Sequence, residues 1–115
     1  MQVKEIQDIF HLKVVAGEKG LDNEVTGGYC GDLLSDVMAN SFKGAVWLTI
    51  QGHQNILAVA VLKEMAAIIL VNGRLPDDDT KAKADDEGIP ILICDLPAYQ
   101  LAGQLYEAGI GNTAE

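Results

Sequence analysis

The sequence predicts an α/β fold, a three-layer sandwich with a mostly parallel sheet. The chain has 115 residues, of which 49% are hydrophobic but only 5% aromatic, so aliphatic side chains must form the core. Short aliphatic runs alternate along the chain with segments of helical periodicity, which is typical of parallel strands joined by crossover helices. This length suits one domain, and we expect residues 1–115 to form it.

The first forty residues predict two helices and two strands. Apolar positions recur at helical spacing in the first ten residues, so a short helix is expected there. Residues 12–16 predict a strand, and residues 25–30 a second one. Glycines inside the second strand indicate a bulge or a close approach of another group. Residues 32–40 again have a helical pattern, with Asp32 available as its N-cap.

The rest of the chain repeats a strand and a helix three times. We expect strands over residues 45–50, 66–71 and 89–94, and helices over residues 55–65, 76–87 and 98–108. The segment 56–62 is apolar throughout and could equally form a buried strand. Turn and capping residues before it, and the need for a crossover between parallel strands, favour the helix.

A helix over residues 55–65 would be apolar all the way round. A small three-layer domain does not cover every side of one helix, so the remaining face suggests a subunit interface and a homodimer. The alternative is that loops and the N-terminal helix cover it. The expected interface residues are Ile56, Val59, Ala60, Leu62 and Lys63.

The charge balance excludes several partners. Eight Lys and Arg face 17 Asp and Glu, giving a net charge of -9, which disfavours nucleic acid and anionic membrane surfaces. No apolar run approaches the roughly 20 residues needed to cross a bilayer, and residues 1–6 do not resemble a signal peptide. We therefore expect a cytoplasmic protein. Cys30 and Cys94 then predict reduced structural thiols, with a disulfide or a reactive thiol as the alternative.

The acidity is concentrated in residues 77–87, which hold six carboxylates and two lysines. Three of these acids open a predicted helix, where they stabilise its N-terminus. A solvated helix face explains the cluster. The alternative is a surface that steers a basic patch of a partner protein.

Candidate ligand-binding residues follow from the expected sheet. Open parallel sheets bind ligands beyond the carboxyl ends of their strands. Arg74, the only arginine, is expected there, where it would hold either an anionic group or a carboxylate of its own chain. The residues expected at these ends are Gln51, His53, Asn55, Asn72, Arg74 and Asp95.

No set of catalytic residues can be assembled from the sequence. The chain contains no P-loop pattern, no dinucleotide-binding glycine pattern and no metal-ligand spacing, so neither a cofactor nor a metal is expected. His53 acting with Asp95 or Asp36 as acid and base is an alternative, but a capping or surface histidine is the simpler interpretation. We expect the protein not to be an enzyme.

Thr26, Gly27 and Gly28 are the remaining candidates for ligand binding. Their glycines allow positive φ or a close backbone approach, although a tight bend would need the same residues. Residues 21–29, followed by residues 32–38, resemble the signature of DRTGG domains, and residues 51–56, 71–74 and 88–92 also match stand-alone bacterial members. The resemblance covers nearly the whole chain. The family's arginine is absent, so any role of that residue has no carrier here.

The resemblance implies a fold similar to the N-terminal domain of HPr kinase/phosphorylase, without the kinase active site. DRTGG domains occur in phosphotransacetylases and between the CBS domains of regulated pyrophosphatases, as regulatory or dimerising modules. We therefore expect a non-catalytic homodimer that senses a small anionic metabolite or nucleotide. The alternative is an interaction subunit that docks on a larger enzyme, such as a hydrogenase or kinase assembly.

Overall fold

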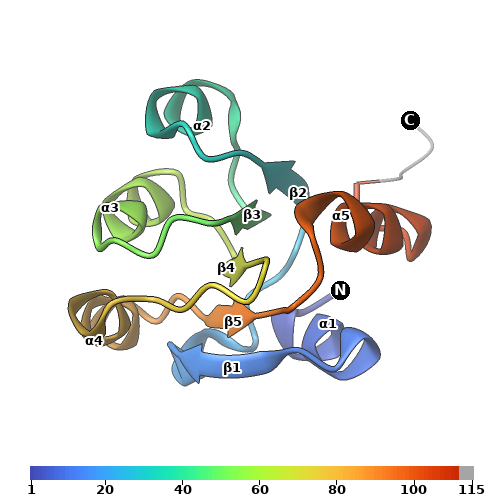
Figure 1. The fold of residues 1–115 in the computed structure, drawn as a ribbon, viewed down its shortest axis with the longest axis horizontal. Coiled ribbons are helices and arrows are strands. Elements are labelled where there is room, and N and C mark those ends of the chain that lie inside the picture. Colours follow the sequence, from blue (N-terminus) through green and yellow to red (C-terminus); the bar gives the residue numbers. More distant parts are fainter. Residues whose placement is uncertain (112–115) are drawn as a thin grey trace.

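The computed structural model describes residues 1–111 and contains one five-stranded sheet with helices on both faces (Figure 1). The strand order is β1-β5-β4-β3-β2. The last four of these strands run parallel to one another, whereas β1 pairs antiparallel with β5. This arrangement confirms the α/β fold class and the mostly parallel sheet. The strands are β1 (Lys13–Ala16), β2 (Gly27–Cys30), β3 (Ala45–Thr49), β4 (Ala67–Leu70) and β5 (Ile91–Ile93).

Five α-helices complete the three layers. The helices α1 and α5 cover one face of the sheet, and α2, α3 and α4 cover the other (Figure 1). A short 3-10 turn, Glu18–Gly20, follows β1. The helices are α1 (Val3–Phe10), α2 (Leu34–Asn40), α3 (Asn55–Leu62), α4 (Asp78–Glu87) and α5 (Ala98–Glu107), so all of the predicted elements are present with shifted ends.

The sheet separates two hydrophobic cores. Successive side chains of a strand point to opposite faces, so Val46 and Leu48 of β3 join the core under α1 and α5. Trp47, between them, joins the core under α2, α3 and α4. Both cores are mostly aliphatic, as the composition predicts.

The apolar segment 56–62 is a helix, which settles the choice against a strand. It lies between α2 and α4, and these neighbours bury more of its surface than expected (Figure 1). The side chains of Ile56, Val59 and Ala60 are buried in the core of the single chain, so they do not form the exposed apolar face that the sequence predicts. Of the five predicted interface residues, Leu62 is exposed and Lys63 partly so.

Two helix boundaries differ from the prediction for identifiable reasons. The helix α3 ends at Leu62, earlier than expected, because the backbone turns at Glu64, which has a φ of 55°. Asp32 does not cap α2, which begins at Leu34 with Leu33 in the N-cap position. No helix among residues 1–111 is long and apolar enough to span a bilayer.

Candidate functional site

Three loops meet at the carboxyl ends of the parallel strands. The loop between β3 and α3 is attached to the start of α4, because the Gly52 carbonyl accepts hydrogen bonds from Asp77 N at 3.0 Å and Thr80 Oγ1 at 2.7 Å. A Cβ on Gly52 would lie 2.6 Å from the Leu75 carbonyl oxygen. Only glycine allows this approach, which holds the loop containing Gln51 beside the segment that follows Arg74.

The turn after β4 presents the only arginine. Asn72 and Gly73 have φ angles of 59° and 69°, and Arg74 N donates to the Val71 carbonyl at 3.1 Å, which closes the turn. Asn and Gly are the residues that adopt such angles most readily. The turn is attached to the loop after β5, since Asn72 N donates to the Leu96 carbonyl at 3.0 Å.

Arg74 and Asp95 therefore lie at the same edge of the sheet, as predicted. A Cβ on Gly73 would be 3.3 Å from Asp95 Oδ1, so the Asp95 carboxylate lies over the turn. Within residues 1–111 the exposed Arg74 side chain forms no ion pair. Its guanidinium is thus available to an anion, and the alternative interpretation, a carboxylate partner in its own chain, is not what the described residues show.

His53 has a local role at the start of α3. Its Nδ1 accepts a hydrogen bond from Asn55 N at 3.1 Å. Both residues are exposed. Among the described residues His53 bonds to neither Asp95 nor Asp36, and Asp36 instead accepts hydrogen bonds from Tyr29 and Asn40. The geometry matches the capping interpretation of His53.

Asp32 joins this edge although the sequence assigned it to a helix cap. Its Oδ1 accepts from Thr49 Oγ1 at 2.8 Å and from Ile50 N at 3.0 Å, and its carbonyl accepts from Gln51 Nε2 at 3.1 Å. It thereby fixes the loop after β2 to the loop after β3. Thr49 is a polar residue in a buried strand, and a buried hydroxyl needs a hydrogen-bond partner. This was the sequence signal from which the contact with Asp32 could have been predicted.

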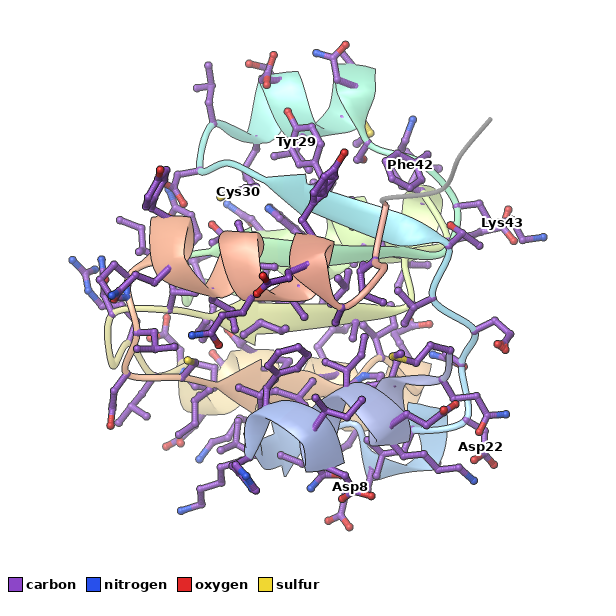
Figure 2. All side chains as sticks on the ribbon, turned by 90° about the vertical axis from the view of Figure 1, so that its right-hand side faces the viewer. Asp8, Asp22, Tyr29, Cys30, Phe42 and Lys43 are labelled. Carbon is purple, nitrogen blue, oxygen red and sulfur yellow. The ribbon has the colours of Figure 1, made fainter. Side chains whose placement is uncertain are left out.

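Thr26, Gly27 and Gly28 lie at the amino ends of the parallel strands, opposite to the carboxyl ends where Arg74 lies. Because β2 and β3 are parallel, the amino end of β2 is far from the loop that follows β3. Figure 2 shows Lys43 and Phe42 beside this amino end and Cys30 at the other end of the strand. The Thr26–Gly28 segment therefore does not form one site with Arg74.

The structure gives Thr26 and Gly27 a packing role. Thr26 Oγ1 donates to the Lys43 carbonyl at 2.7 Å. A Cβ on Gly27 would lie 2.9 Å from the Phe42 ring, so the glycine admits an aromatic side chain. Neither Gly27 nor Gly28 has a positive φ, and their pairing with β3 contains no bulge. The sequence predicted that another group approaches these glycines closely, and at Gly27 that group is the Phe42 side chain.

Hollows occur at both edges and beside α5. One of about 590 Å³ at the amino edge is lined by Thr26, Lys43, Glu64 and Glu87 among others. Another of about 290 Å³ contains His11, Lys13 and Asp95. A third, of about 300 Å³, lies between β2 and α5. Among residues 1–111 no group of His, Cys, Asp and Glu side chains is arranged to hold a metal ion.

Two side chains on β2, Tyr29 and Cys30, have pKa values above their ordinary ones. The hydrogen bond that Tyr29 donates to Asp36 raises the pKa of the Tyr29 phenol. Partial burial raises the pKa of the Cys30 thiol, and the nearby Asp32 carboxylate adds to this. A raised pKa keeps the thiol protonated and poorly nucleophilic. Cys30 and Cys94 do not form a disulfide within residues 1–111.

Comparisons with known proteins bear on the fold. No model of a known protein family matches the chain, and no curated protein matches it either. A solved structure does, that of the CBS and DRTGG domains of the regulatory region of Clostridium perfringens pyrophosphatase, complexed with the activator diadenosine tetraphosphate. The likeness has a TM-score of 0.62 at 11% sequence identity and covers 90% of this chain and 45% of that chain. It supports a DRTGG-like fold.

Proposed function

We propose that this protein is a regulatory, ligand-sensing domain, not an enzyme, and that it works as a homodimer in the cytoplasm. The observation that carries the proposal is the likeness to a regulatory region whose structure was solved with a nucleotide activator. The ligand expected here is a nucleotide or another small anionic metabolite. It would bind at the carboxyl edge of the sheet, where the guanidinium of Arg74, which has no ion pair within residues 1–111, lies among the loops fixed by Gly52 and Asn72.

The chemistry of this edge suits binding better than turnover. Arg74 offers donors to phosphate or carboxylate oxygens, while the exposed amides of Gln51, Asn55 and Asn72 offer both donors and acceptors. Asp95 beside the turn accepts from hydroxyl or amino groups. The Nδ1 atom of His53 accepts a hydrogen bond from the backbone, and among the described residues no nucleophilic side chain is hydrogen-bonded to His53.

A thermal-shift experiment tests the ligand part. ATP, AMP and diadenosine tetraphosphate are added separately to the protein, and one of them is expected to raise Tm. At a hundredfold excess over Kd a ligand adds about 2.7 kcal/mol to stability, which corresponds to a rise on the order of 10 °C. We expect Arg74→Ala to abolish the rise, because the anion loses its guanidinium.

The control variant is Lys19→Ala, which removes an exposed positive charge beside Gly88, at the amino edge. It should keep the full rise in Tm. An equal loss of the Tm rise in both variants would mean that the nucleotide responds to the net charge of the protein and not to Arg74 in particular. No shift with any of the three nucleotides, or with a panel of small phosphorylated metabolites, would contradict the ligand proposal.

One observation favours the second candidate, an interaction subunit of a larger enzyme. The carboxylates of Asp78, Asp79, Asp86 and Glu87 on α4 are exposed, and within the described residues only Lys81 and Lys83 pair with acids of this helix. Such a surface would steer a basic partner. Replacing Asp78, Asp79 and Asp86 by Asn should then prevent co-purification with that partner, and co-purification that survives the change would contradict the role of this surface.

A further inference from the structure

The two outermost strands of the sheet, β1 and β2, differ in how well they are protected against pairing with strands of other molecules. Edge strands have free N–H and C=O groups, which proteins block with lysines, prolines or bulges. The edge strand β1 begins with Lys13 and has a register shift between Val14 and Ala16. The other edge strand, β2, has no charged residue, no proline and an unbroken register with β3. Among residues 1–111 β2 pairs only with β3.

The surface around β2 is poor in charge and carries exposed aromatic side chains. Tyr106 of α5 is 51% exposed, and Phe42 on the other side of the strand is 40% exposed. Between β2 and α5 lies the hollow of about 300 Å³. Its lining is uncharged and consists of Gly28, Tyr29, Cys30, Leu48, Ala102, Leu105, Tyr106, Ile110 and Gly111.

This lack of charge is local. The chain has a net charge of -9, yet α5 carries no charge from Ala98 to Tyr106, and residues 25–31 carry none. Depletion of charged residues together with exposed Tyr and Phe is typical of the central part of protein interfaces. Two acidic chains can approach each other on this surface with less repulsion than elsewhere.

We infer that the open edge of β2 is the dimer interface, where two copies pair their β2 strands antiparallel and join their sheets into one. The inference rests on the homodimer proposed above and assigns its surface. A two-fold axis brings the same patch of both copies together, and identical strands related by that axis and lying edge to edge run antiparallel. The glycines of β2 carry no side chains that would hinder the approach.

The charges near the two ends of β2 are complementary in this arrangement. The amino end lies beside Lys43, whose side chain is 80% exposed, and the carboxyl end leads to the exposed Asp32 and Asp36. Antiparallel pairing places Lys43 of one copy toward these carboxylates of the other, twice by symmetry. Its present partner, Glu64 at 3.7 Å, is also exposed, so that pair contributes little and does not hold Lys43 back.

The first test compares two variants that each add one negative charge at an exposed apolar residue. Tyr106→Glu changes the proposed interface, while Leu62→Glu changes α3, the face suggested by sequence; Leu62 is 69% exposed. Sedimentation equilibrium of the full chain at micromolar concentration should give a dimer for the wild type and for Leu62→Glu. Tyr106→Glu should be a monomer, with dimerisation weakened at least tenfold, and circular dichroism should show it folded.

The other outcomes separate the two proposals. Loss of the dimer in Leu62→Glu, or its survival in Tyr106→Glu, overturns the β2 interface but leaves the homodimer standing. A monomeric wild type overturns both, while the nucleotide-dependent rise in Tm still reports on ligand sensing by itself.

A charge exchange tests the antiparallel direction. Lys43→Glu and Asp36→Lys should each weaken the dimer, because like charges then meet across the two-fold axis. The double variant restores opposite charges and should recover most of the lost affinity. If the double variant dimerises no better than the single ones, the antiparallel pairing is wrong.

Discussion

Replacing Trp47 by alanine is expected to lower the free energy of unfolding by about 3–5 kcal/mol. Trp47 is the largest of the fully buried side chains and lies on β3, in the interior of the sheet. It packs in the core beneath α2, α3 and α4. Its Nε1 donates to the Gly31 carbonyl at 2.9 Å, so truncation leaves both a cavity and a carbonyl oxygen without that donor.

A loss of this size is a large part of the roughly 5–15 kcal/mol that stabilise a domain. Urea denaturation followed by circular dichroism measures it, because the variant lacks the only tryptophan and its fluorescence. Leu75→Ala is the control: Leu75 is 66% exposed, and its truncation should change stability by less than about 0.5 kcal/mol. A Trp47→Ala variant within 1 kcal/mol of the wild type would contradict this packing.

The layers of the fold could be predicted because each element carries its own local signal. Gly88, with a φ of 68°, ends α4 where the sequence placed the end, and Ala84 accepts its N–H. The place of β1 had no such signal. Its pairing of Val14 with Leu92 joins residues far apart in the chain and runs opposite to the other strands. Local patterns do not encode such long-range pairing.

The candidate site was predicted where one topological rule was sufficient. Arg74 and Asp95 follow neighbouring parallel strands, and their carboxyl ends meet at one edge whatever the order of the remaining strands. Thr26 is a separate ligand-binding candidate in the sequence because two glycines follow it, but it precedes its strand and so lies at the other end of the strands. Asp32 was misassigned because a local capping preference competed with a distant hydroxyl, that of Thr49, and the tertiary contact won.

The burial of Ile56 and Ala60 on α3 could not be predicted for a related reason. Ile56 and Ala60 look surplus when one helix is considered alone, yet α2 and α4 on either side leave them no exposed surface. The open edge of β2 gives no corresponding excess of apolar residues in the sequence. Its strand is short, and half of it is glycine, so only the strand order reveals that it lies at the end of the sheet.

The second large effect is expected for Gly17→Ala, in the turn after β1. Gly17 has a φ of 71°, and a Cβ there would lie 2.1 Å from the Ile89 carbonyl oxygen and 2.8 Å from Pro90 Cα. Neither atom belongs to a flexible side chain, so the turn must move away from the start of β5. Left-handed backbone costs a non-glycine residue about 1–2 kcal/mol, and overpacking adds roughly 1–3 kcal/mol.

Gly88→Ala separates these two contributions. Gly88 has nearly the same φ, 68°, but a Cβ there would meet only the Lys19 side chain, at an ordinary 3.6 Å. Gly88→Ala should therefore lose about 1–2 kcal/mol from backbone strain alone. Gly17→Ala should lose about 2–5 kcal/mol, and urea midpoints measured side by side give the difference. Equal losses of stability in the two variants would mean that the backbone at Ile89 and Pro90 moves away from the new Cβ at little cost. The close approach at Gly17 would then contribute little to holding β1 against β5. A larger loss at Gly17 would instead show that the antiparallel strand β1, whose place the sequence does not reveal, is held in part by a backbone approach that only glycine permits.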